Sequence, residues 1–152
     1  MLDKLQNFLY EEIPLTQQMG LTLVEFRPLQ LIIKAPLKPN INDKGTVFGG
    51  SSSALMIITA WSLIKLNCQQ FGIDADIVIH KNETTWQKAL SSELIIKANI
   101  ENSYDFGQIK KSIDSGKHQR VMCQIALHDQ QQEIYSTMSA KYVIIPKTKN
   151  IT

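Results

Sequence analysis

The stretch NINDKGTVFGGSSSALMIITAWSLIKL, residues 40–66, decides the fold. It opens as a polar turn, passes two glycines and three serines, and becomes an almost unbroken apolar run. The apolar part, residues 54–64, is too short to cross a bilayer, which takes about 20 residues. A helix that is apolar nearly all round has to be covered on every side. The stretch therefore predicts a helix over residues 50–64, buried inside the protein, with a glycine-rich turn at its N-terminal end.

The chain length and the amino-acid composition favour a single globular domain over residues 1–152. Of the 152 residues, 20% are charged and 43% hydrophobic, which is typical of a folded chain with a sizeable core. The net charge of +2 and the lack of a Lys/Arg run argue against nucleic acid as a partner. The N-terminus has no basic segment or cleavage site of a signal peptide. Cys68 and Cys123 form no CxxC motif, so we expect two buried thiols in a reducing cytoplasm.

Upstream of the central stretch, the pattern predicts short helices and then a hairpin. Apolar residues repeat at helical spacing in the first ten residues. Pro14 suits a first helical turn and Gly20 suits a stop, so residues 1–20 are expected to hold two helices. Residues 21–26 and 29–37 alternate as strands, and Arg27-Pro28 between them is typical of a turn.

Downstream, about four more strands are expected. Residues 104–117 look like a short helix or turn that ends at Gly116, residues 129–132 form a hairpin turn, and residues 146–152 form a flexible tail. Short links and one apolar face per strand indicate a mostly antiparallel sheet. A sheet curled around the buried helix gives an α+β fold. The apolar faces are Leu94, Ile96, Ala98 and Ile100; Val121, Cys123, Ile125 and Leu127; and Ile134, Met138, Ala140, Tyr142 and Ile144.

This layout resembles the hotdog fold, in which a curved antiparallel sheet wraps around one long central helix. PLTQQMGLTL, PNINDKGTVFGGSSSAL and IVIHKNETTW further resemble the YiiD C-terminal family, a group of thioesterase-like proteins. The N-x-N-x-x-G-T-x-F-G-G-S string is the specific part. The resemblance implies a homodimer, or a dimer of dimers, with active sites between two subunits. It also implies an acyl-CoA or acyl carrier protein substrate in the cytoplasm. Coenzyme A or phosphopantetheine would enter as part of the substrate, with no separate cofactor.

The chemistry of a thioester gives the glycine-rich turn a role of its own. The carbonyl oxygen gains negative charge during hydrolysis, and backbone N–H groups at a helix N-terminus are ready donors to it. Gly49 and Gly50 have no side chain, so a substrate can approach their amides closely. Ser51 would cap the helix or orient the ligand. A tight turn with an ordinary serine cap is the simpler alternative.

Side chains before the helix are further candidates, each with a structural alternative. Asn42 would donate to the oxyanion or hold a water, or it would support the loop as an Asx-turn residue. Thr46 would donate to a substrate carbonyl or carboxylate, or serve as a plain loop residue. Asp43 is the one carboxylate of the turn and a candidate general base, or a solvated turn residue.

Four more residues complete the candidate site. Asn40 and Gly45 lie in the same string, and for Asn40 we expect a structural role. Phe48 lines the acyl pocket or packs into the core, and core packing is the expectation. Trp86 lines the acyl tunnel or simply packs. The three histidines, His80, His118 and His128, have no partner at metal-ligand spacing, so no metal is expected.

The expected helix lacks the Asp or Glu that many hotdog thioesterases carry in its first turns. Ile57 and Ile58 occupy that region. Three functions therefore stay open: thioester hydrolysis, decarboxylation of a malonyl-acyl carrier protein, which needs an oxyanion site without a base, and non-catalytic binding of an acyl thioester. The sequence does not define the acyl chain or its carrier.

Overall fold

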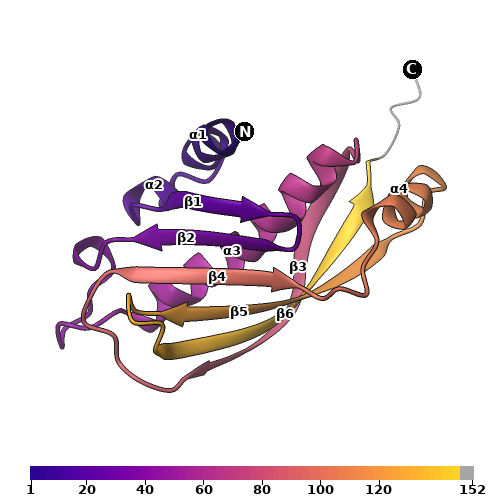
Figure 1. Ribbon diagram of the computed structural model, residues 1–152. Helices are drawn as coiled ribbons and strands as arrows, with labels where there is room; N and C mark the ends of the chain where they lie inside the picture. The colour runs from indigo at the N-terminus through magenta and orange to yellow at the C-terminus, as the bar shows by residue number, and fades with distance from the viewer. Residues whose placement is uncertain (148–152) are drawn as a thin grey trace.

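The computed structural model describes residues 1–147 of the chain. Six strands form one antiparallel sheet in the order β1-β2-β4-β5-β6-β3 (Figure 1). The expected count of two strands before the central helix and four after it is confirmed. The strands are β1 (Thr22–Arg27), β2 (Gln30–Ala35), β3 (Ala75–Trp86), β4 (Leu94–Ile100), β5 (Gln119–His128) and β6 (Ile134–Pro146).

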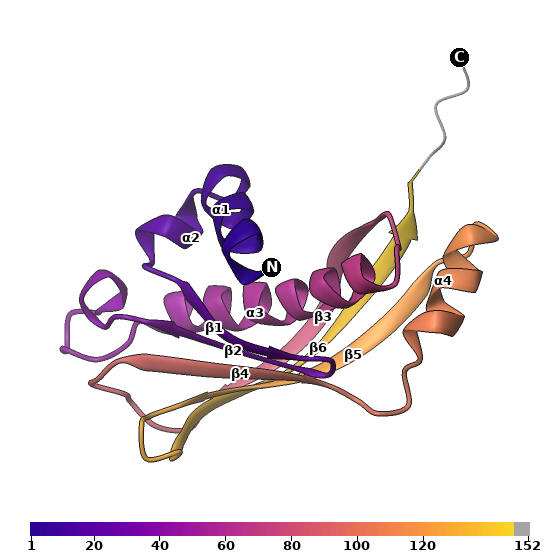
Figure 2. The same ribbon diagram turned by 45° about the horizontal axis from the view of Figure 1, so that its top comes forward.

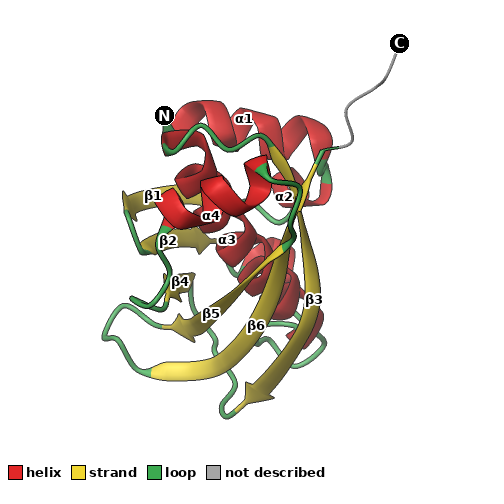
Figure 3. Cartoon of the chain, turned by 90° about the vertical axis from the view of Figure 1, so that its right-hand side faces the viewer, coloured by secondary structure: helices red, strands yellow, loops and turns green. Residues whose placement is uncertain are grey.

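The central helix α3 (Gly49–Gln70) lies in the concave side of this sheet (Figure 2). Figure 3 shows the sheet from its side, with the strands curving around α3. The helix is longer than the predicted 50–64, because Leu66, Asn67 and Cys68 continue its buried face. This is the hotdog arrangement, and the predicted fold is confirmed.

The N-terminal helices cover the side of α3 that the sheet leaves open. α1 (Leu2–Glu12) buries Leu5 and Leu9, and its Phe8 ring stacks on Trp61 of α3 with centroids 6.2 Å apart. α2 (Leu15–Gln18) follows directly after Pro14, and Gly20 ends it with a φ of +72°. Both helices expected within residues 1–20 are therefore present.

Strand alternation places one apolar row of each strand against α3. The predicted rows of β4 and β5 are buried along their whole length, with Leu94 and Val121 fully covered. The prediction for Ile134 is wrong, because its side chain is 48% exposed and Ser136 takes the buried place. The pairing of β5 with β6 shifts register between Leu127 and His128. β6 has one extra residue at this point, so Ile134 and Ser136 on its two sides lie on opposite faces of the sheet.

The remaining elements link the strands. η1 (Lys38–Asn40) follows β2, and α4 (Phe106–Asp114) follows β4. The Asp105 side chain accepts from the backbone N–H of Gly107 and Gln108, which caps α4. Pro146 pairs with Ala75 as the last residue of β6, so the predicted tail does not begin there. Residues 148–152 of that tail lie outside the described residues. Within residues 1–147, no helix has the length and apolar composition needed to cross a membrane.

Candidate functional site

The polar turn before α3 is built around the Asn42 side chain. Its Oδ1 accepts from the backbone N–H of Lys44 at 2.8 Å and of Thr46 at 3.1 Å. Its Nδ2 donates to Thr46 Oγ1 at 3.0 Å, and its backbone N–H donates to Thr46 O at 2.8 Å. Gly45 closes the turn at a φ of +78°, which a residue with a side chain rarely adopts. Asn42 is therefore an Asx-turn residue that fixes the loop.

Two further contacts anchor this turn to the body of the protein. Val47 N–H donates to Leu90 O and Phe48 N–H donates to Asn40 O, each at 2.8 Å. The Asn40 side chain is buried and donates to the backbone oxygens of Met19 and Pro36. The structural role expected for Asn40 is confirmed. The start of α3 is thus held by three separate segments of the chain.

The N-terminus of α3 has no side-chain cap. Phe48 is the N-cap residue, and the first bonded amide is that of Ser52, which donates to Phe48 O. The N–H groups of Gly49, Gly50 and Ser51 donate to no backbone or side-chain acceptor within residues 1–147. The cap expected of Ser51 is wrong, because the helix begins two residues earlier. These three amides, with the positive end of the helix dipole, form an anion-binding geometry.

A chain of hydrogen bonds fixes the first turn of α3 against the sheet. Trp86 Nε1, at the end of β3, donates to Ser52 Oγ at 3.2 Å, and Ser52 Oγ donates to Gly49 O at 3.0 Å. Ser52 is 1% exposed. A Cβ on Gly49 would lie 3.3 Å from Trp86 Nε1, so the indole borders this glycine directly. Sequence reasoning missed Ser52, because its partner lies 34 positions away.

The Phe48 ring stands over Gly50 on the other side of the helix end. A Cβ on Gly50 would come within 2.4 Å of the ring, so glycine is required for this arrangement. The ring itself is 56% exposed. The expected core packing of Phe48 is therefore wrong. An aromatic ring that covers a helix N-terminus from the solvent side shields it from water and leaves apolar surface for a ligand.

Two open depressions flank the helix end. One, of about 410 Å³, lies beside Asn42, Thr46, Gly49 and Trp86. The other, of about 320 Å³, lies beside Phe48, Gly50 and Ser51 together with apolar residues of α2 and η1. Of the ten predicted site residues, seven border these depressions, while Asn40, Asp43 and Gly45 border neither.

No acidic side chain of α3 reaches these depressions, because the helix contains none. Ile57 and Ile58 occupy the helical positions where the hotdog resemblance would place an Asp or Glu, and Ile58 is buried. Asp43 is exposed and pairs with Lys44 at 3.1 Å, which matches the solvated-turn alternative. Within residues 1–147, no three His, Cys, Asp or Glu side chains are grouped to hold a metal.

The two cysteines are not suited to act as nucleophiles. Burial raises the pKa of the Cys68 thiol to about 11 and that of Cys123 to about 12. Both side chains are at most 2% exposed, so the expectation of two buried thiols is confirmed. A protonated, buried thiol is a poor nucleophile.

A family model and several solved structures match nearly the whole chain. The model of the family described as "Putative thioesterase (yiiD_Cterm)" matches residues 2–146. A solved structure of a "putative thioesterase" from Shewanella oneidensis is 25% identical, with 95% of this chain and 97% of that chain covered and a TM-score of 0.86. A Chlorobaculum tepidum protein of unknown function is 22% identical over 95% and 94% of the two chains, with a TM-score of 0.86. A Haemophilus influenzae thioesterase is 12% identical over 100% and 95%, with a TM-score of 0.79.

Proposed function

The chain belongs to the YiiD C-terminal family of thioesterase-like proteins, and on that premise we propose that it hydrolyses acyl thioesters. The substrate is an acyl group on coenzyme A or on acyl carrier protein. The observation that supports this most is the open N-terminus of α3, where the N–H groups of Gly49, Gly50 and Ser51 have no internal acceptor among the described residues.

In this proposal the three amides bind the thioester carbonyl oxygen. Attack on the carbonyl carbon moves an electron pair onto that oxygen, and fixed N–H dipoles stabilise the resulting charge without reorganising. Trp86 and Ser52 hold the first helical turn at its position. The turn from Asn42 to Thr46 orients the attacking water beside Gly49, because both residues border the same depression. Phe48 and the apolar residues beside Gly50 receive the acyl chain.

A second copy of the chain completes the site. β3 has one strand neighbour, β6, so its other edge is unpaired among the described residues. Apolar side chains on that strand are exposed, including Val78 at 43% and Trp86 at 53%. A long edge strand with exposed apolar groups is suited to pairing with another strand. We infer a homodimer through β3, which would bring partner residues next to Trp86 and supply the base that α3 lacks.

Decarboxylation of a malonyl thioester is the alternative, and the acid-free helix favours it. The bond between the α-carbon and the carboxylate breaks, carbon dioxide leaves, and the electron pair forms an enolate. The same three amides would stabilise the enolate oxygen. A proton from water then returns to the α-carbon and gives the acetyl thioester. This reaction needs no residue that removes a proton.

One assay separates these functions. Purified protein is incubated with acyl-CoA and acyl carrier protein substrates, including malonyl forms, while free thiol and carbon dioxide are measured separately. Thiol without carbon dioxide indicates hydrolysis, and carbon dioxide with an intact acetyl thioester indicates decarboxylation. Neither product, with substrate still bound, indicates a non-catalytic binding protein and contradicts both enzymatic proposals.

Asn42→Ala tests the polar turn in the same assay. Loss of its four side-chain hydrogen bonds should loosen the turn and lower kcat by about tenfold or more, within the range for a disturbed oxyanion site. Asp43→Asn is the matched control next to it, because among the described residues the exposed Asp43 carboxylate is bonded by Lys44 alone. An unchanged rate for Asn42→Ala would remove the turn from the mechanism.

A further inference from the structure

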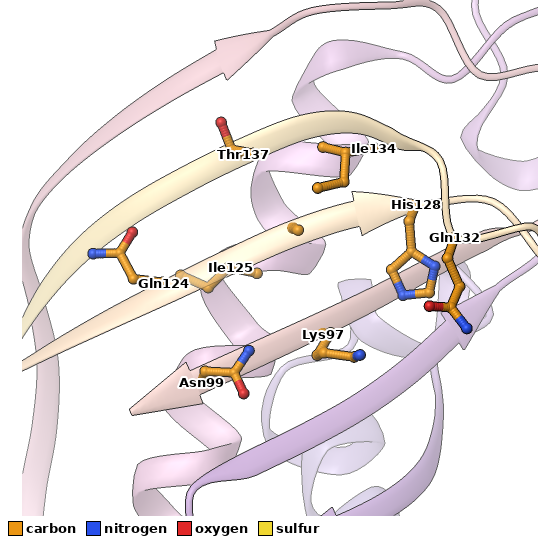
Figure 4. Close-up of a pocket in the computed structure, with 9 residues that line it drawn as sticks. Lys97, Asn99, Gln124, Ile125, His128, Gln132, Ile134 and Thr137 are labelled. Atoms are coloured by element: carbon orange, nitrogen blue, oxygen red, sulfur yellow. The ribbon is translucent and has the colours of Figure 1, made fainter. Parts of the chain in front are cut away.

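A second depression lies on the outer face of the sheet, on the side away from α3. Its volume is about 320 Å³. Strand register explains why it forms. Ala126 of β5 stands directly between Lys97 of β4 and Thr137 of β6. Gln124 and His128 are the next outward residues along β5. A small residue surrounded by four longer polar ones leaves a hollow above itself, and Figure 4 shows these side chains around it.

The His128 ring has a fixed orientation and an unmet hydrogen bond. Its Nδ1 lies 2.8 Å from the backbone oxygen of Asp129. A carbonyl oxygen only accepts, so Nδ1 carries a proton and donates. Nε2 is buried and has no partner among the described residues. Because Nδ1 carries the proton, Nε2 is an acceptor, and only a group that donates a hydrogen bond can satisfy it.

The hairpin after β5 keeps this ring in place. The Asp129 carboxylate accepts from the backbone N–H of Gln131 and of Glu133, each at 2.9 Å, and from the Tyr135 hydroxyl at 3.0 Å. Burial opposes its ionisation, but these three bonds outweigh that effect and lower the pKa of the Asp129 carboxyl. The carboxylate is therefore used inside the hairpin, where it also interacts electrostatically with His128, so free positive charge in the depression has to come from another side chain.

Lys97 supplies that positive charge. It takes part in none of the ion pairs formed within residues 1–147. The other acid of the hairpin, Glu133, is paired with Lys88. Figure 4 shows the Lys97 ammonium directed toward His128 and Gln132. An ammonium without an ion-pair partner among the described residues attracts anions to this hollow.

One neutral side chain, that of Asn99, adds hydrogen-bond donors. The Asn99 carbonyl oxygen accepts from Gln30 Nε2 at 3.0 Å, which leaves the Asn99 amide hydrogens for other acceptors. The Thr137 hydroxyl donates to the side-chain oxygen of Gln87 at 3.1 Å, so Thr137 borders the hollow without a free hydrogen. Ile134, 48% exposed, gives the rim an apolar contact.

We propose that this hollow, formed by Lys97, Asn99, His128 and Thr137 around Ala126, is a binding site for a small organic oxyanion. The ligand carries a carboxylate or phosphate group on a short apolar stem. Lys97 pairs with its charge, and the Asn99 side-chain amide donates a hydrogen bond to it. The stem lies against Ile134. The volume is in the range of small-molecule sites. This site lies across the sheet from α3 and does not depend on the function proposed there.

The test titrates the full chain with sodium butyrate in one series and inorganic phosphate in another, with the imidazole ¹⁵N signals of His128 as readout. We expect saturable shifts at His128 with at least one anion. Lys97→Ala should weaken that binding by about tenfold or more, the effect of losing one charge-assisted bond. Lys141→Ala, a charge-matched change on the same face of β6, should alter the Kd by less than about twofold. The anion that binds tighter identifies the carboxylate or the phosphate class.

Three results would overturn the proposal. Shifts at His128 that do not saturate would show that no defined site exists. Equal weakening by Lys97→Ala and Lys141→Ala would show that the anion responds to overall charge. Absence of anion binding, with light scattering that shows a larger assembly lost in Lys97→Ala, would show that this face contacts another copy of the chain. Lys97→Met, which keeps an apolar stem of similar length and removes the charge, provides a milder variant if Lys97→Ala lowers the Tm, and it leaves the His128 signals in place.

Discussion

The two ends of α3 differ in the hydrogen bonding of their terminal backbone groups. At the C-terminal end, Ile73 N–H donates to Cys68 O and Gly72 N–H donates to Gln69 O, with Gly72 at a φ of +67°. This is a Schellman motif, and buried Ile73 and Cys68 provide its apolar contact. At the N-terminal end, three amides have no acceptor among residues 1–147. The same helix is closed where it serves stability and open where a ligand would bind.

Thiol chemistry gives the largest expected contrast between the two ends. Ser51→Cys places a thiol at the open end, where the helix dipole lowers its pKa. Burial raises the pKa of native Cys68, at the closed end, to about 11. At pH 7.5 the introduced thiol should react with an aromatic disulfide reagent about a thousandfold faster than the native pair, in proportion to thiolate content. Equal rates in a stopped-flow assay of variant and wild type would show that the two ends do not differ.

Gly50→Ala tests the open end by steric means. The added Cβ would come within 2.4 Å of the Phe48 ring and push it across the amides. We expect kcat/KM to fall about a hundredfold, comparable to losing an oxyanion donor. Because the ring is 56% exposed, it can move without disturbing the core, and the free energy of unfolding should change by less than about 0.5 kcal/mol.

The double variant Gly50→Ala, Phe48→Ala distinguishes the ring from the glycine. It should regain part of the lost rate, because the displaced ring is gone. Full activity of the single variant would contradict the role of this glycine.

Two serines of α3 allow a matched test of the Trp86 hydrogen-bond chain. Ser52→Ala breaks the bonds to Trp86 and to Gly49 O, and we expect kcat to fall about tenfold with KM little changed, because the oxyanion amides shift slightly. Ser62 is also buried, but its hydroxyl has no partner among the described residues. Ser62→Ala should therefore leave the rate unchanged. Equal effects of the two changes would assign Ser52 a packing role only.

Gly72→Ala should have the smallest effect, and on stability alone. An alanine at this positive φ is strained, although no atom lies within 4 Å of the added Cβ. Urea unfolding should show a loss of about 1 kcal/mol. The thioesterase or decarboxylase rate should stay within about twofold of wild type, because the closed end takes no part in binding. A large loss of activity would show that the two ends are coupled.

Much of this architecture could be predicted from residue patterns, because burial of one face of a strand or helix makes apolar residues recur at a regular spacing. The alternation of residues 94–100 and the apolar run of residues 54–64 follow directly from contact with one core. Ile134 escaped this reasoning because a bulge changes the register, and no local signal marks it.

The sequence predicted the segment that forms the candidate site, but not the roles of its individual residues. Glycines before a buried helix indicate an open N-terminus, and the structure has one. The fine roles depend on distant partners. Trp86 reaches Ser52 across 34 positions, and Phe48 turns outward because Gly50 leaves room for its ring. The sequence left two roles open for Asn42, a ligand contact or an Asx turn. Its hydrogen bonds in the structure identify the Asx turn.

Amide NMR with a substrate analogue tests the central claim most directly. The analogue replaces the thioester sulfur of an acyl-CoA with methylene, which keeps the carbonyl and prevents hydrolysis. The account predicts that the backbone N–H signals of Gly49, Gly50 and Ser51 move downfield on saturation, while those of Gly72 and Ile73 stay in place. Saturable binding that leaves the three N-terminal amides unchanged would contradict it.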